Sequence, residues 1–418
     1  MDTKVIKNIL SLFSIQGMNY VLPLLTLPYL VRVLGPLGYG HLSFSLAIIQ
    51  YFLLLTQYGF NFSATKRIAE SNGNKNDISI IFFNVIYTKV FLCVAGFVIL
   101  LLTSLVSGQL HDIQIVLIAA YIMVIGDVIF PVWLFQGQEK MGRIALSNIV
   151  AKFMTVPLIF IFVKTSNDIA LAAFISGLTN LFSGLIGLYS VYKMGLIHWR
   201  KPNLNGIKHE LSESWHYFLS SAAISLYTAT TVVLLGFICG PVVVGYFTAA
   251  DKIRQAVQGL INPVSQALYP RISALMKNNS VRAYTFLRKL LVIQGIGTLA
   301  VSVVLFVFSA DIIHLLYGHQ FQQSITVLSV LAWLPFIIGL SNIFGIQTLL
   351  TTGHKVIFSR VLLMGGILNI IILIPLAWYY SGVGAAISVL SVETAIVFMM
   401  FIAIRKLKLP LFIFKVQK

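Results

Sequence analysis

Apolar runs long enough to cross a bilayer alternate along this chain with short polar gaps, and the cations gather in every second gap. A helix needs about 20 apolar residues to cross the hydrocarbon core. Such runs lie near residues 9–31, 41–62, 80–106, 113–136, 144–163, 168–192, 213–238, 244–268, 289–309, 324–350, 356–378 and 382–404. A mean hydropathy of +0.92 with 10% charged residues excludes a soluble domain of this length. The sequence therefore predicts an all-α polytopic membrane protein with twelve transmembrane helices.

The distribution of Lys and Arg predicts the orientation of these helices. One set of gaps and ends holds 23 cations: Lys4, Lys7, Lys66, Arg67, Lys75, Lys140, Arg143, Lys193, Arg200, Lys201, Lys208, Arg271, Lys277, Arg282, Arg288, Lys289, Lys355, Arg360, Arg405, Lys406, Lys408, Lys415 and Lys418. The opposite set holds Arg32 and Lys164. Short loops rich in cations stay in the cytoplasm. We therefore expect both termini to be cytoplasmic.

The net charge of +17 follows mostly from this topology. Because the cations are spread over many loops, they indicate contact with anionic phospholipids rather than with nucleic acid. The chain has no G-x-x-x-x-G-K-[ST] phosphate loop and no Asp-x-Asp pair, and its two Cys and eight His show no metal-ligand spacing. We expect neither a metal nor an organic cofactor, and no catalysis.

The two halves of the sequence resemble each other at an offset of 205 residues. Gly40 matches Gly245, and Lys66 matches Arg271. Just upstream of the first match, Gly35 and Pro36 resemble Gly240 and Pro241. Six crossings is an even number, so the second half repeats the first in the same orientation, as in many transporters. We expect two six-helix bundles, 1–200 and 201–418, around a central cavity.

The same offset relates two polar stripes on the second and eighth crossings. Spacings of seven and four residues keep their side chains on one helix face. The amides concerned are Gln50, Gln57 and Asn61 in the first half and Gln255, Gln258, Asn262 and Gln266 in the second. Amides facing lipid would lack hydrogen-bond partners. The stripes are therefore expected to line a wet cavity, the alternative being hydrogen bonds that join neighbouring helices.

Few charges lie deep in the predicted crossings. A charge in hydrocarbon is costly and usually faces the protein interior. The cations Lys89, Lys152 and Arg254, with Arg32 near a helix end, are candidates to bind an anionic group, because Lys and Arg are strong donors to phosphate. The carboxylates Asp127, Asp251 and Glu393 are candidates to carry a coupling H⁺ or Na⁺. Pairing of Asp127 or Glu393 with Lys89 or Lys152 is an equal alternative, and Asp251 and Arg254 have the spacing of an intrahelical pair.

Three segments resemble bacterial polysaccharide transporters. They are PLLTLPYLVRVLGP at 23–36, continuing to Tyr39-Gly40, Gly59-Phe60 and Lys66 to Ala69; PVWLFQGQEKM at 131–141; and GYFTAADKI at 245–253, continuing to PRIS at 270–273. These motifs are similar to those of the lipid-linked O-antigen repeat-unit flippases. That family lies within the MATE-like multidrug/oligosaccharide-lipid/polysaccharide exporter (MOP) superfamily. The similarity runs along essentially the whole chain.

The resemblance implies a MATE-like fold of two six-helix bundles and alternating access driven by an ion gradient. It implies movement of an undecaprenyl-pyrophosphate-linked oligosaccharide from the cytoplasmic to the periplasmic leaflet, in a pathway with a polymerase and a chain-length regulator. The four cations would then hold the pyrophosphate, and the amide stripes would bind the glycan. The alternatives are a drug or cation antiporter of the same fold and, less favoured, a membrane polysaccharide polymerase or ligase.

Overall fold

The computed structural model describes the backbone of residues 3–201 and 203–412, which is almost entirely helical and has no strand in those ranges. Side chains are described over the same ranges except 3–24, 220–221, 223–228, 260, 262–264 and 266–267. The helices are α1 (Thr3–Gln57), α2 (Phe60–Glu70), α3 (Lys75–Val106), α4 (Gly108–Asp112), α5 (Gln114–Ala120), α6 (Ile122–Ile129), α7 (Val132–Gly137), α8 (Met141–Phe162), α9 (Ile169–Met194), α10 (Leu204–Cys239), α11 (Pro241–Asn278), α12 (Ser280–Val307), α13 (Ser309–Tyr317), η1 (His319–Phe321), α14 (Gln323–Leu331), α15 (Leu334–Asn342), η2 (Ile343–Leu350) and α16 (Lys355–Lys406).

The described helices confirm an all-helical membrane fold. By length and composition, eight helical segments of the described chain are able to span a membrane. Two of the longest helices, α1 and α16, each correspond to two predicted crossings. Each consists of two helices joined at a kink, at Gly35 in α1 and at Ser381 in α16. The fourth predicted crossing is divided among α5, α6 and α7, and Phe130 and Pro131 separate the last two. The twelve predicted crossings are consistent with this arrangement.

The backbone conformation supports the internal repeat. Gly35 has φ 65° and ψ 179°, and Gly240 has φ 81° and ψ 174°. This region is open almost only to glycine, since a Cβ clashes with the backbone there. In each half the following proline starts a new helix, where its missing N–H costs no hydrogen bond. The two Gly-Pro pairs thus make the same kink at corresponding places.

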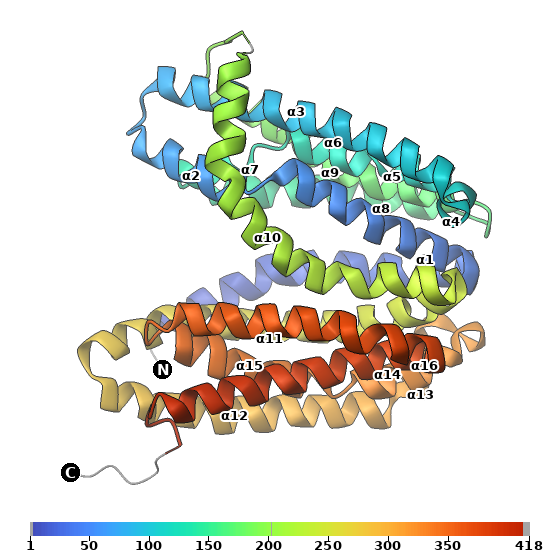
Figure 1. The fold of residues 1–418 in the computed structure, drawn as a ribbon, viewed down its shortest axis with the longest axis vertical. Coiled ribbons are helices and arrows are strands. Elements are labelled where there is room, and N and C mark those ends of the chain that lie inside the picture. Colours follow the sequence, from blue (N-terminus) through green and yellow to red (C-terminus); the bar gives the residue numbers. More distant parts are fainter. Residues whose placement is uncertain (1–2, 202, 413–418) are drawn as a thin grey trace. The chain divides into compact units, whose positions relative to one another are not determined.

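The helices form two compact units. One unit comprises residues 29–233, and the other comprises residues 1–28 together with 234–418. The division predicted from the sequence, at residue 200, stays a prediction about the transport bundles. Within the unit 29–233, α9 packs along α5, α6 and α8 (Figure 1). Within the other unit, α11 and α16 pack on α14.

Close helix packing in the unit 29–233 depends on small residues. A Cβ on Gly126 of α6 would stand 2.3 Å from the backbone of Asn180 on α9, and one on Gly184 would stand 2.6 Å from the carbonyl oxygen of Gly126. Small residues let helices in a membrane approach until their backbones touch. This contact fixes the position of α6, and with it the side chain of the next residue, Asp127.

A cluster of large apolar side chains holds one end of this unit together. Phe60, Ile68, Ile78, Trp133 and Phe135 are almost fully buried among α2, α3 and α7. Removing a large side chain from such a core typically costs about 3–5 kcal/mol. The helices of this cluster carry or adjoin cations of one predicted side of the membrane, such as Arg67 in α2 and Lys140 after α7.

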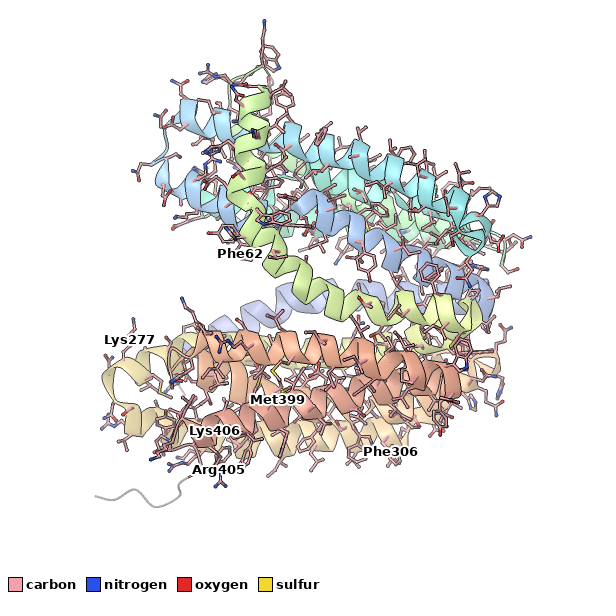
Figure 2. The ribbon with its side chains drawn as sticks, viewed as in Figure 1. Phe62, Lys277, Phe306, Met399, Arg405 and Lys406 are labelled. Atoms are coloured by element: carbon pink, nitrogen blue, oxygen red, sulfur yellow. The ribbon has the colours of Figure 1, made fainter. Side chains whose placement is uncertain are left out.

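Cations of the other unit gather at one end of its helices. Figure 2 shows Lys277, Arg405 and Lys406 at the end where α11 leads into α12, and Phe306 toward the opposite end of α12. This arrangement agrees with the cation pattern of the sequence, in which the same three residues belong to one side of the membrane.

Candidate functional site

A buried charge cluster joins three helices in the middle of the unit 29–233. Lys89 of α3 is only 3% exposed, and its Nζ donates to the Asp127 carbonyl oxygen at 2.6 Å and to Asp127 Oδ2 at 3.0 Å. The amide of Gln57, at the end of α1, donates to Asp127 Oδ1 at 3.0 Å. The carboxylate thus receives one charged and one neutral donor, as a buried ion pair requires.

This cluster brings together residues for which the sequence predicted three separate roles. Lys89 was expected to bind pyrophosphate, Gln57 to bind glycan and Asp127 to carry a coupling ion. In the structure they form one hydrogen-bonded group in which the charge of Lys89 is compensated by Asp127. The sequence left this pairing open as an alternative, and the structure shows it. In this conformation Lys89 is therefore not available to an incoming anion.

A second charge cluster lies within one turn and a half of α11. Arg254 Nε donates to Asp251 Oδ1 at 2.6 Å, and Gln255 Nε2 donates to Asp251 Oδ2 at 2.6 Å. The side chains of Asp251 and Arg254 are 17% and 14% exposed. Lys252 is exposed and lies 3.4 Å from Gln255 Oε1. The intrahelical pair expected from the spacing is confirmed, and it compensates the charge of Arg254.

The remaining predicted cations and carboxylate occupy different surroundings. Lys152 is half-buried on α8, one turn before Thr155, whose hydroxyl lies 2.8 Å from that of Thr179 on α9. Arg32 is exposed on α1, and Glu393 is half-buried on α16. Their predicted roles in binding the anion and the ion stay predictions.

The amide stripes are described in part. Gln50 is exposed on α1, while Asn61 on α2 and Gln258 on α11 are half-buried. Gln258 Oε1 is buried without a hydrogen-bond partner in the described part of the chain, so it retains acceptor capacity. The side chains of Asn262 and Gln266 lie outside the described residues. Between Gln50 and Gln57, the Tyr51 hydroxyl contacts Thr230 of α10 at 3.0 Å.

The sequence did not predict the contact that holds the first half of α10 against α2. Arg67 donates to Glu210 Oε1 at 2.6 Å, and Ser63 and Ser214 are joined by a 2.7 Å hydrogen bond. The rings of Tyr58 and Phe218 stack with centroids 4.5 Å apart. Burial raises the pKa of Glu210, and the Arg67 guanidinium opposes that rise. Because 143 residues separate Arg67 from Glu210, no local spacing could reveal the pair.

A buried amide in the second half was also missed. Gln347 is fully buried in the π-helix η2, where its Nε2 donates to the Ser265 carbonyl at 2.9 Å. Its Oε1 has no partner within the described residues. A π-helix often marks a functional position because it widens the helix and re-aims side chains. The sequence offered no distinct signal for it, because Asn342 and Thr348 are polar residues of the same predicted crossing.

The sequence of this chain is similar to a known protein family and to curated proteins of two bacteria. A family profile described as "Polysaccharide biosynthesis protein" matches residues 5–276, more than half of the chain. A curated protein of Escherichia coli (strain K12) with the description "Putative O-antigen transporter" is 38% identical over 403 residues, which cover 96% of this chain and 97% of that protein. The chain belongs to the polysaccharide biosynthesis protein family.

A second curated relative carries the same description. The protein of Shigella dysenteriae is 34% identical over 406 residues, covering 96% of this chain and 100% of its own length. Two solved membrane transporters share the fold. An inward-facing MATE family multidrug transporter matches with a TM-score of 0.72 at 15% identity, covering 96% of both chains. The lipid II flippase MurJ, in an inward closed conformation, matches with a TM-score of 0.73 at 15% identity, covering 94% of this chain and 87% of that one.

Proposed function

We propose that the chain is a flippase for lipid-linked oligosaccharides. Its cargo would be an O-antigen or related repeat unit on undecaprenyl pyrophosphate, moved from the cytoplasmic to the periplasmic leaflet of the bacterial inner membrane. One observation carries this proposal: similarity over nearly the full length to relatives described as O-antigen transporters. Since no bond of the cargo is broken, the chain needs no catalytic residues.

The amide stripes suit the glycan part of such a cargo. Sugar hydroxyls both donate and accept hydrogen bonds, and Asn and Gln side chains offer both functions without a charge to desolvate. Gln50 is exposed, and the buried Oε1 of Gln258 has no partner among the described residues. Asn61 likewise makes no side-chain hydrogen bond within the described residues, whereas Gln57 and Gln255 already donate to carboxylates.

The pyrophosphate part needs cations as hydrogen-bond donors. Pyrophosphate that binds Lys89 or Arg254 competes with Asp127 or Asp251 for the charge of that cation. Breaking a buried pair leaves an uncompensated charge, which is unfavourable unless the anion or a proton compensates it. The two other candidates for the anion are Lys152, which is half-buried on α8, and Arg32, which is exposed on α1; Lys152 is tested first because the sequence places it deeper in its crossing.

An ion gradient would drive transport through the same two ion pairs. If H⁺ or Na⁺ binds the carboxylate of Asp127 or Asp251, the neighbouring cation is released for the pyrophosphate. Glu393 is the third candidate carboxylate. The cation pattern supports a cytoplasmic position for both termini, on the side from which the cargo would be taken. A polymerase and a chain-length regulator would act on the cargo after it has crossed, and anionic phospholipids surround the cation-rich ends.

Complementation tests this function. The chain is expressed in a bacterium whose own O-antigen flippase is deleted, and surface polysaccharide is measured by gel and antibody staining. Wild-type protein is expected to restore the polymer. Lys152→Ala is expected to reduce the amount of surface polymer while the amount of protein in the membrane stays normal. Lys164→Ala, which changes an exposed lysine on the opposite side of the membrane, is the matched control and should leave the polymer unchanged. Absence of polymer with the wild-type chain in several such hosts would contradict the proposal.

A cation antiporter remains the second candidate because of the MATE-like fold. It predicts extrusion of cationic dyes from cells that express the chain. Dye extrusion without restored polysaccharide would favour that reading over the flippase.

A further inference from the structure

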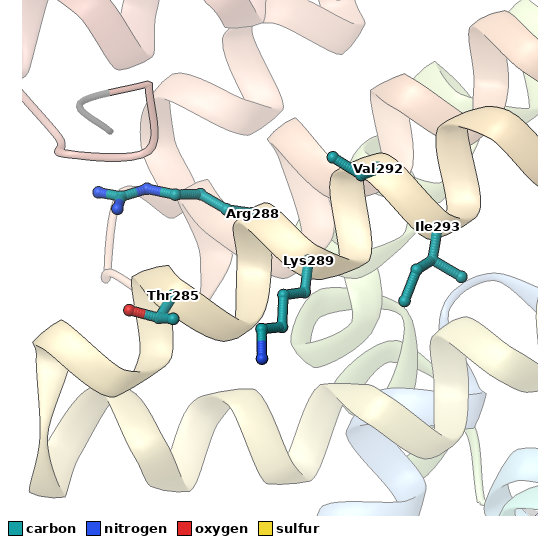
Figure 3. A pocket seen from close by; sticks show the side chains of 5 residues that line it. All are labelled: Thr285, Arg288, Lys289, Val292 and Ile293. Atoms are coloured by element: carbon teal, nitrogen blue, oxygen red, sulfur yellow. The ribbon is translucent and has the colours of Figure 1, made fainter. Parts of the chain in front are cut away.

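A groove runs along the exposed face of α12, apart from the charge clusters described above. The cavity has a volume of about 350 Å³ and is lined by Thr285, Arg288, Lys289, Val292 and Ile293. Figure 3 shows that Arg288 and Lys289 leave the helix in different directions. Two cations and Thr285 thus belong to the lining at one end of the groove, and Val292 and Ile293 to the lining at the other.

The two cations differ in what they contact. Arg288 donates to the carbonyl oxygens of Pro410 and Leu411, which follow α16, so its guanidinium is fixed against the C-terminal segment. Lys289 is exposed and makes no hydrogen bond or ion pair with the described residues. Its ammonium group therefore has all three donors available for a ligand in the groove.

The groove changes from polar to apolar along one helix face. Thr285, Lys289 and Ile293 are spaced by four residues, and Val292 and Ile296 continue the same face. Ile293 is 71% exposed and Ile296 is 64% exposed. Lys289 and Ile296 are seven residues apart, so the apolar part extends about 10 Å beyond the ammonium group. Such a face matches the boundary between headgroups and hydrocarbon.

The position of this boundary agrees with the rest of the unit. Lys277, Arg405 and Lys406 gather at the same end of the helices, as Figure 2 shows. Lys289 is the last cation of α12 before its long apolar stretch. In a membrane its ammonium group would therefore lie at the depth of the phosphate groups of one leaflet.

We propose that the groove binds one anionic phospholipid. Its phosphate contacts Lys289, and one acyl chain lies along Val292, Ile293 and Ile296. The Thr285 hydroxyl donates to the Val281 carbonyl at 2.9 Å and so keeps acceptor capacity for a headgroup hydroxyl, as in phosphatidylglycerol. This lipid is distinct from the transported cargo, and the proposal depends on insertion in a membrane but not on the flippase function.

Native mass spectrometry of the full-length protein in detergent tests the site. Phosphatidylglycerol is titrated, with phosphatidylcholine as the uncharged comparison. A surface lysine contributes about 1 kcal/mol near an anionic surface, or about a fivefold change in affinity. Lys289→Gln is expected to lower the apparent affinity for phosphatidylglycerol about fivefold and to leave that for phosphatidylcholine unchanged. Lys277→Gln, an exposed lysine outside the groove, is the matched control.

The outcomes separate the possible occupants. Equal loss in Lys277→Gln, or no loss in Lys289→Gln, would overturn the site. Displacement of phosphatidylglycerol by undecaprenyl phosphate at much lower concentration would assign the groove to the cargo instead and would also overturn it. In the unaltered protein, a photoreactive phosphatidylglycerol is expected to label residues 285–296. Labelling spread over other helices, with none in this range, would contradict the proposal.

Discussion

The Lys89–Asp127 pair allows a direct test of how the buried charges contribute to stability and to transport. Lys89→Met removes the ammonium group but keeps most of the side-chain volume, so Asp127 keeps a single neutral donor, Gln57. The two side chains are 4% and 17% exposed, so water offers little compensation. Removing one partner of a buried pair costs about 3–5 kcal/mol. We expect a loss of this size in Lys89→Met.

The double variant Lys89→Met with Asp127→Asn measures the pair itself. The asparagine oxygen still accepts the hydrogen bond from Gln57, and no uncompensated charge remains. Pairs in direct contact show interaction energies of about 0.5–3 kcal/mol in such cycles. The double variant is therefore expected to be more stable than Lys89→Met alone. The assay is the unfolding midpoint of purified protein in detergent, with the Asp127→Asn single variant completing the cycle.

Transport distinguishes a structural pair from a coupling pair. If Asp127 carries the coupling ion, the double variant is stable yet loses the dependence of transport on the ion gradient. If the pair is structural, restored stability also restores gradient-dependent transport. Wild-type stability in Lys89→Met would refute the reasoning, since it would mean that Asp127 is not buried with its charge compensated by Lys89.

Three further substitutions test other parts of the account by the same unfolding measurement. Arg67→Met is expected to cost about 3 kcal/mol at neutral pH, because it leaves the ionised carboxylate of Glu210 buried without its cation. Burial raises the pKa of Glu210 above its ordinary 4.5, so Glu210 favours the folded state most below pH 4.5 and less as pH rises through its folded-state pKa. The substitution should therefore cost less at pH 5, where more of the carboxyl is protonated, and a cost that does not change with pH would contradict this. Gly126→Ala should cost about 1–3 kcal/mol by forcing α6 from α9, whereas Gly142→Ala, with open space around it, should be tolerated. Gly240→Ala should cost about 1–3 kcal/mol through backbone strain at φ 81°, and an unchanged midpoint would show that the kink is not retained.

Much of the fold can be predicted from the sequence, because apolar runs determine where helices form and glycines determine where they bend. The apolar runs predicted the helices, and the two Gly-Pro pairs predicted corresponding features that the structure shows as the same kink. The break in α16 was expected from the gap between two runs, but its position at Ser381 with φ 51° was not, because serine rarely adopts that conformation. The π-helix η2 has the composition of an ordinary apolar helix, so no pattern predicts it.

The candidate site was predictable only as a set of unusual residues. Lys89 and Asp127 stand out in the sequence because each is a charge deep in an apolar run. Their pairing depends on the approach of α3 and α6, which tertiary packing decides. Glu210 lies in the polar gap that also holds Lys208, and in the structure it is fully buried against Arg67. Contacts between residues more than 100 positions apart are beyond the reach of helical periodicity.

Transport by the purified protein tests the central claim most directly. Proteoliposomes that contain the full chain and a fluorescent oligosaccharide on undecaprenyl pyrophosphate are compared with protein-free liposomes, and arrival of the glycan in the opposite leaflet is followed with an impermeant quencher. The account predicts that the protein accelerates this movement and that an imposed H⁺ or Na⁺ gradient increases its rate. Movement no faster than in protein-free liposomes, with folded protein inserted in both orientations, would contradict the account.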